Sequence, residues 1–300
     1  MSCIKSILAI TPVIFFCCCG SGTADKEESV AVESLEGSWR RISVMNQETG
    51  EWIPIPPNVI YEKYISPTHF CWVNYDIERD TLLGTGGGTY ILDQESATYT
   101  EDIRFFLPAG SQLLGQTIPF DVRFEDGNWH HTGFSKIFEF DPETGENVVK
   151  DSSKIEEIWE RTDTPASQDG LIGTWELESF RGQGDSIRSD YPEFVSYVKL
   201  ITPTHFVWVH YLSEQDQVLA EGGGTYSYDG NTYTETLKFV YPSGSGQVGT
   251  VLPFNCRIDG DKWYHKGYII IHTEDQDGSS TVDTVTIDEI WKPFTGLGSS

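Results

Sequence analysis

The feature that most constrains the fold of this chain is an internal repeat that spans most of its length. The segment GSWRRISV from Gly37 returns as GTWELESF from Gly173, and SPTHFCWVNY from Ser66 returns as TPTHFVWVHY from Thr202. Both pairs of segments lie 136 residues apart, and the spacing then falls to 134 and finally to 132 residues where connecting loops differ in length. Stacked solenoid repeats have periods of roughly 20–50 residues, so this longer period predicts two complete domains in tandem.

The limits of these domains follow from composition. The segment RTDTPASQDG between the two copies is rich in Pro, Ser and Asp and has no core-forming residue, which is typical of a linker. A chain of 300 residues is long enough for two domains of about 125 residues each. We therefore predict a lipoprotein signal peptide at 1–19, a flexible tether at 20–34, a first domain at 35–161, a linker at 162–170 and a second domain at 171–295.

The N-terminal segment MSCIKSILAITPVIFFCCCGSG has the organisation of an export signal. Lys5 supplies the positive charge, and the apolar stretch at 7–16 is too short to span a bilayer. Cys17 and Cys18 are small residues before Cys19, which makes Cys19 the predicted site of lipidation, although Phe16 stands where Leu is usual in a lipoprotein signal. We predict a lipid-anchored protein of the cell envelope, with the outer membrane favoured. A plain secretory signal, acylation of Cys17 or Cys18, and either periplasmic or cell-surface exposure remain open.

The charge balance restricts the partners. The chain has 46 acidic and 20 basic residues, a formal net charge of −26. Nucleic acids and anionic lipid surfaces are both bound through clustered Lys and Arg. We therefore expect no nucleic-acid partner, and contact with a membrane only through the lipid anchor.

The pattern within each copy predicts an all-β fold. Each copy holds about eight short runs of alternating apolar and polar residues, and no segment has a convincing amphipathic helical pattern. Short hairpin loops, such as the Asp-Gly turn in YDGN, join most neighbouring runs. We predict two tandem eight-stranded up-and-down β-barrels, whose interiors are either filled by side chains or wide enough for one small ligand. In the second copy the runs begin near Thr174, Tyr197, His205, Gly223, Thr232, Val251, Lys262 and Thr284.

An ordered set of motifs carries a resemblance to a known family. Each copy starts with Gly-x-Trp (GSW and GTW) and continues with PTHFxWVxY, GGGTY, TYTE, a Trp-x-His-x-Gly segment and EIW. This set resembles the lipocalins, and in particular the lipocalin-like domains of bacterial secreted lipoproteins, over nearly the whole mature chain. The resemblance implies a barrel that binds small molecules, and it implies no particular activity. It also implies a late basic residue that packs on the first Trp, for which Arg161 and Lys292 are the candidates.

Two acidic residues break the alternation in the same way. In NTYTETLKFV, Glu235 falls on the face that also carries Tyr233 and Leu237, and Glu101 lies in the same way beside Tyr99. A His from a later strand is expected to face the same interior, since it shares a face with a Trp. The predicted ligand-binding residues are Glu101, His131, Tyr99 and Trp72 in the first barrel, and Glu235, His265, Tyr233 and Trp208 in the second.

Three functions remain open at this stage. A buried Glu is costly unless it is paired, so each Glu and His could be a purely structural pair inside a filled barrel that serves as a scaffold or accessory subunit of a surface complex. The same two groups could anchor the polar end of a small, partly apolar ligand. They could also act as acid and base in an enzyme. We assign no catalytic residue, because nothing marks a nucleophile, and we predict no metal site and no cofactor.

Two further motifs are assigned structural roles. No Lys-Ser or Lys-Thr and no helical pattern follow the GGGTY segments, so their glycines are expected to mark a bulge or a tight bend of the barrel and not a phosphate loop. Cys71 corresponds to Val207, and Cys256 corresponds to Val122, so both cysteines are predicted to be buried thiols without a disulfide.

Overall fold

A computed structural model of the chain describes residues 34–163, 170–212, 217–246, 248–274 and 280–294. Across these ranges the secondary structure consists of strands and turns, and no helix is present, which confirms the all-β prediction. The strands of the N-terminal repeat (35–161) are β1 (Gly37–Met45), β2 (Trp52–Pro54), β3 (Val59–Ile65), β4 (His69–Asp76), β5 (Thr81–Asp93), β6 (Thr98–Leu107), β7 (Thr117–Glu125), β8 (Asn128–Asp141) and β9 (Glu146–Arg161).

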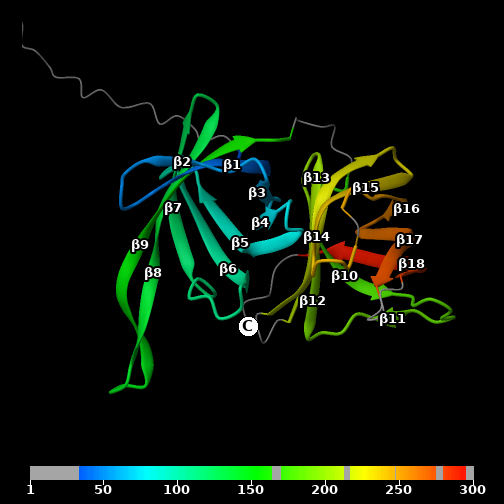
Figure 1. Cartoon of the computed structure of the whole chain (residues 1–300). Helices are drawn as coiled ribbons and strands as arrows, with labels where there is room; N and C mark the ends of the chain where they lie inside the picture. Colours follow the sequence, from blue (N-terminus) through cyan, green and yellow to red (C-terminus); the bar gives the residue numbers. More distant parts are fainter. Residues whose placement is uncertain (1–33, 164–169, 213–216, 247, 275–279, 295–300) are drawn as a thin grey trace, which may run out of the picture. The chain divides into compact units, whose positions relative to one another are not determined.

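Eight of these strands close into an antiparallel barrel. Strand β1 pairs with β3, each strand from β3 to β8 pairs with the next one, and β9 returns to pair with β1. The short strand β2 forms an extra pairing with the C-terminal end of β1, at Ser43 to Met45. Figure 1 shows this succession of strands in sequence colours from blue to green. The chain order is that of a meander, as the short hairpin loops predicted.

The strands of the C-terminal repeat (171–295) follow the same order of pairings. Strand β10 pairs with both β12 and β18, and the strands from β12 to β18 each pair with the next one. The strands are β10 (Gly173–Phe180), β11 (Ser189–Asp190), β12 (Val195–Ile201), β13 (His205–Leu212), β14 (Gln217–Tyr228), β15 (Thr232–Tyr241), β16 (Val251–Asp259), β17 (Lys262–Glu274) and β18 (Ser280–Pro293).

The triple glycines form bulges, as predicted. The register between β5 and β6 shifts between Gly87 and Gly88, and the register between β14 and β15 shifts at the equivalent step between Gly223 and Gly224. A Cβ atom on Gly88 would lie 1.9 Å from the carbonyl oxygen of Asp102. Only glycine lets the two strands approach this closely, so the motif shapes the barrel wall.

The two repeats contact each other through equivalent residues. The described residues of both belong to one compact unit. The hydroxyl of Ser38 lies 2.6 Å from that of Thr202, and Ser66 lies 2.6 Å from Thr174. Ser38 is equivalent to Thr174, and Ser66 to Thr202, so the two bonds are reciprocal. A buried apolar cluster also joins residues of β3 and β4 with residues of β12 and β13.

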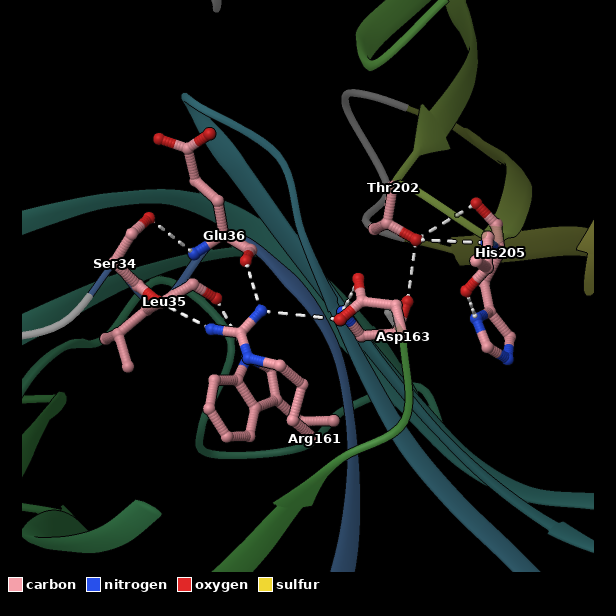
Figure 2. A network of polar contacts seen from close by, with 10 residues as sticks. Ser34, Leu35, Glu36, Arg161, Asp163, Thr202 and His205 are labelled. Carbon is pink, nitrogen blue, oxygen red and sulfur yellow. Dashed lines mark hydrogen bonds and ion pairs between the residues drawn. The ribbon is translucent and has the colours of Figure 1, made fainter. Parts of the chain in front are cut away.

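Arg161 closes the N-terminal barrel over the Trp of the Gly-x-Trp motif, as the resemblance implied. Its guanidinium lies 4.2 Å from the ring of Trp39 and donates hydrogen bonds to the carbonyl oxygens of Ser34 and Glu36. Figure 2 shows this network together with Asp163, whose carboxylate accepts a hydrogen bond from the backbone of Ser38. Asp163 falls within the predicted linker, yet it is buried, so the linker is anchored at its first residues.

In the second repeat, Lys292, the other candidate, lies 3.4 Å from Glu176, in a surface ion pair. Cys71 and Cys256 are buried and form no disulfide with a described residue, which confirms their assignment as thiols. The predicted signal peptide, Cys19 and nearly all of the tether lie outside the described residues. Among the residues that the structure describes, none forms a helix with the length and apolarity needed to cross a bilayer.

Candidate functional site

The misplaced glutamates are each paired with a buried lysine. The Lys63 ammonium on β3 lies 2.6 Å from the Glu101 carboxylate on β6, and Lys199 on β12 lies 2.7 Å from Glu235 on β15. All four side chains are almost fully buried, as the alternation indicated for the two glutamates. The predicted pairing of each Glu with a His is wrong, because the carboxylate binds a lysine from the third strand of each repeat.

Aromatic rings surround each buried lysine. The Lys199 ammonium lies between 5.2 and 5.8 Å from the ring centres of Phe206, Tyr233, Trp263 and Trp291. These distances allow cation–π attraction, which partly replaces the hydration that the ammonium loses on burial. Removing either partner of such a buried ion pair strongly destabilises the fold, because the remaining charge would be uncompensated.

The histidines belong to a second polar cluster. The ring of His265 donates from Nδ1 to the carboxylate of Glu289 on β18 at 3.1 Å, and the indole of Trp291 donates to the same carboxylate at 3.0 Å. Burial and the charge of Lys199 lower the pKa of His265, so the ring is neutral at pH 7. With the proton on Nδ1, the Nε2 atom of His265 is a hydrogen-bond acceptor, and it has no partner among the described residues.

The equivalent cluster in the N-terminal repeat contains an arginine. The carboxylate of Glu157 accepts hydrogen bonds from Arg41 at 2.5 Å and from the indole of Trp159 at 3.1 Å. The guanidinium of Arg41 also lies 3.3 Å from the centre of the Tyr61 ring. In the C-terminal repeat, Leu177 occupies the position that is equivalent to Arg41, 136 residues further along the chain.

The two repeats enclose cavities of different size. A cavity of about 340 Å³, which we call the C-terminal cavity, lies among β12 to β18, with Trp208, Leu237, Leu252 and Phe254 among its apolar walls. The cavity at the equivalent place in the N-terminal repeat has a volume of about 90 Å³. The ionisable side chains that line the C-terminal cavity are Tyr197, Lys199, His210, Glu235, His265 and Glu289.

Identifiable substitutions distinguish the larger cavity from the smaller one. Val240 lines the C-terminal cavity where the N-terminal repeat has Phe106, whose ring packs on Trp72 with 5.4 Å between the ring centres. The smaller Val240 leaves the corresponding volume unfilled. Asn74, in the N-terminal repeat, is equivalent to His210.

Side-chain hydrogen bonds fix the loop between β6 and β7 beside the N-terminal cavity. The amide of Gln112 exchanges two hydrogen bonds with the backbone of Phe138 on β8, at 2.8 and 3.0 Å, and Gln116 does the same with Lys136 at 2.8 and 2.9 Å. Gly246 and Thr250 stand at the equivalent positions beside the C-terminal cavity, and both line it. Glycine has no side chain and threonine has no amide, so neither residue can form the paired hydrogen bonds that Gln112 and Gln116 make.

Six of the eight predicted site residues line the cavities. Trp72, Glu101 and His131 line the N-terminal cavity, and Trp208, Glu235 and His265 line the C-terminal one. Tyr99 and Tyr233 are fully buried and are not among the lining residues. Each packs against the Trp and the His of a strand two positions further along the sheet, β8 or β17. The interior residues that were not predicted from the sequence are Lys63, Lys199, Arg41, Tyr61, Tyr197, His210, Glu157 and Glu289.

A signal for the lysines was present in the repeat itself. The segment YEKYI in β3 returns as YVKLI in β12, so the lysine recurs although Glu62 and Tyr64 are replaced by Val198 and Leu200. Similarly, the recurrence of EIW places a Glu before a buried Trp in both last strands. Recurrence of a charged residue in a buried strand of both repeats was therefore the missed indication of a buried ion pair.

The fold and this interior define an all-β barrel protein that encloses buried ion pairs and an internal cavity. Comparison of the chain with protein-family models, with curated proteins and with solved structures found no match. Within the described ranges, no group of three or more His, Cys, Asp or Glu side chains is placed to hold a metal ion.

Proposed function

We propose that the C-terminal repeat forms a second eight-stranded barrel in tandem with the first, and that this barrel binds a small, partly apolar ligand in its interior. The observation that carries the proposal is the C-terminal cavity of about 340 Å³, into which apolar walls and a few ionisable side chains converge. Small-molecule sites are typically concave, mostly apolar and supplied with a small number of placed polar groups, with volumes from roughly 300 Å³ upwards.

The strand pairings support the second barrel. Strand β18 pairs with β10 over the residues Trp175 to Phe180, as β9 pairs with β1 in the first barrel. Both pairs also contain one register shift, at equivalent positions. A closed barrel would explain how Lys199 and Glu235, on non-adjacent strands, meet in one interior.

For the N-terminal repeat we propose a structural role. Its cavity of about 90 Å³ is too small for a ligand of ordinary metabolite size, and the charged groups of its interior are paired with one another. The filled-barrel hypothesis from the sequence fits this repeat, whereas the other repeat has a cavity large enough for the ligand-binding hypothesis. We further propose that Cys19 carries a lipid that holds the protein at the cell envelope, which mass spectrometry of the processed N-terminus would test.

A fluorescent ligand tests the binding function. N-phenyl-1-naphthylamine, an uncharged dye that brightens in apolar surroundings, is expected to bind the tether-free protein with one site per chain. Val240→Phe, which introduces the residue of the N-terminal repeat, should abolish this site because its ring fills part of the cavity. Val251→Phe is the matched control, since Val251 is exposed on β16. Equal dye binding by Val240→Phe and the wild-type protein would reject the interior site.

A further inference from the structure

We propose that the ligand of the C-terminal cavity carries a cationic group, such as a protonated amine or a guanidinium, that binds beside Glu289. This inference rests on the proposed ligand-binding function and specifies the chemical class of the ligand. It comes from comparing equivalent positions in the two repeats. One repeat contains its own cation at this place, and the other has a leucine and a larger cavity.

The N-terminal repeat shows what its cluster holds. Arg41 places its guanidinium against the Glu157 carboxylate at 2.5 Å and over the Tyr61 ring at 3.3 Å. Tyr61 and Glu157 both line the N-terminal cavity, and the guanidinium of Arg41 contacts both of these side chains. The same three-part arrangement, a carboxylate, an aromatic face and a cation between them, is a common way to recognise organic cations.

The C-terminal repeat keeps the receptor groups and lacks the cation. Glu289 and Tyr197 are the equivalents of Glu157 and Tyr61, and both line the C-terminal cavity. Leu177, which replaces Arg41, is buried and apolar.

The charges within the C-terminal cavity do not balance. Lys199 is paired with Glu235 at 2.7 Å, so this pair compensates itself. Glu289 accepts hydrogen bonds from the neutral donors His265 and Trp291, and no Lys or Arg of the described residues lies within ion-pairing distance of it. A buried carboxylate without a counter-charge is costly, and a cationic ligand would supply that charge.

The neighbouring basic residues are committed elsewhere. Asp288, on the opposite side of β18, forms ion pairs with Arg188 and Lys266, and Glu176 forms one with Lys292. His210 does not replace Arg41 as a cation, although its ring lies 3.5 Å from the Tyr197 ring, because burial lowers its pKa to about 4. The histidines of this site are therefore neutral near pH 7.

The remaining polar groups of the site also suit a hydrogen-bond donor. The Nε2 atoms of His265 and His210 have no partner among the described residues, and both side chains line the cavity. Nε2 of His265 is an acceptor, because Nδ1 donates to Glu289. An ammonium or guanidinium group offers several N–H donors, so it can satisfy the carboxylate and the imidazole together.

Three probes of similar shape test this inference at pH 7.5. We would measure displacement of the bound dye by 2-phenylethylamine, 2-phenylethanol and 3-phenylpropanoate, which are cationic, neutral and anionic respectively. The amine is expected to bind at least about tenfold more tightly than the alcohol, and the carboxylate more weakly than both. Glu289→Gln should remove the preference for the amine while the alcohol still binds.

A transplanted arginine provides a second test. Leu177→Arg copies the internal cation of the N-terminal repeat, so it should abolish amine binding, and Leu177→Met should leave it unchanged. Equal affinity for amine and alcohol in the wild-type protein, or amine preference retained in both Glu289→Gln and Leu177→Arg, would overturn the inference and leave the binding function standing. Failure of the dye and of all three probes to bind would overturn both proposals.

Discussion

The carboxyl group of Glu221 should make the stability of this protein fall as the pH rises through neutrality. Glu221 lies on β14, fully buried where the two repeats meet, and accepts hydrogen bonds from Thr85 at 3.1 Å and Cys71 at 3.6 Å. No Lys or Arg of the described residues pairs with it, and burial raises its pKa from 4.5 to about 8. The group is therefore protonated in the native state at neutral pH.

The sign of the effect follows from proton counting. Between pH 4.5 and about 8 the folded protein keeps a proton on Glu221 that the unfolded chain has lost, so the free energy of unfolding decreases as the pH rises. Each pH unit within this window costs about 1.4 kcal/mol. Between pH 6 and 8.5, a range that includes the pKa of the folded state, we expect a loss of about 2–3 kcal/mol from this one group.

Urea unfolding followed by Trp fluorescence measures this loss. Glu221→Gln keeps the shape of the side chain and cannot ionise, so the difference in unfolding free energy between variant and wild type should grow by about 2–3 kcal/mol from pH 6 to 8.5. The buried histidines titrate equally in both proteins and cancel in the difference. Glu48→Gln, which changes an exposed carboxylate, is the control and should follow the wild type. A difference that is constant with pH would refute a protonated Glu221.

Three other variants test the fold and the site. Glu235→Gln leaves the Lys199 ammonium without its partner and should reduce the free energy of unfolding by about 3–5 kcal/mol. Replacing both partners by apolar residues should cost much less. A loss below about 1 kcal/mol for the single variant would argue against the ion pair. Gly88→Ala should prevent folding or lower the melting temperature sharply, because its Cβ would collide with a backbone carbonyl. Gly246→Ala is the control and should be tolerated, since the nearest contact of its Cβ would be 3.5 Å away. Equal melting temperatures of the two variants would contradict the bulge geometry. Arg161→Ala should cost about 1–2 kcal/mol through the lost cation–π contact and hydrogen bonds, and an unchanged urea midpoint would show that this closure contributes nothing.

Much of the strand order could be predicted from the sequence. Seven of the eight predicted strand starts in the C-terminal repeat lie within about four residues of the observed ones, because alternation and turn residues are local signals. The exception is β14, which begins at Gln217, six residues before the predicted Gly223, since a glycine run conceals the alternation. The repeat also located Glu101 and Glu235 on the interior face.

The partners of these glutamates could not be read from alternation. Strand β3 buries Glu62 and Lys63, which point to opposite faces, because one face meets the barrel interior and the other meets the second repeat. A one-sided pattern of apolar and polar residues does not exist in such a strand, and the rule that charged residues face water fails there. The size of each cavity was equally inaccessible, since it depends on substitutions such as Val240 for Phe106, whose effect on volume appears only in three dimensions.

The reciprocal bonds between Ser38 and Thr202 and between Ser66 and Thr174 have a consequence for specialisation. This is the contact pattern of a two-fold symmetric dimer, in which both subunits necessarily share every substitution. Here both halves belong to one polypeptide and have separate sequences, so a substitution in one interior does not change the residues of the other. The chain can therefore keep Arg41, paired with Glu157, in one half and have Leu177 at the equivalent position of the other half, where we propose the cation site.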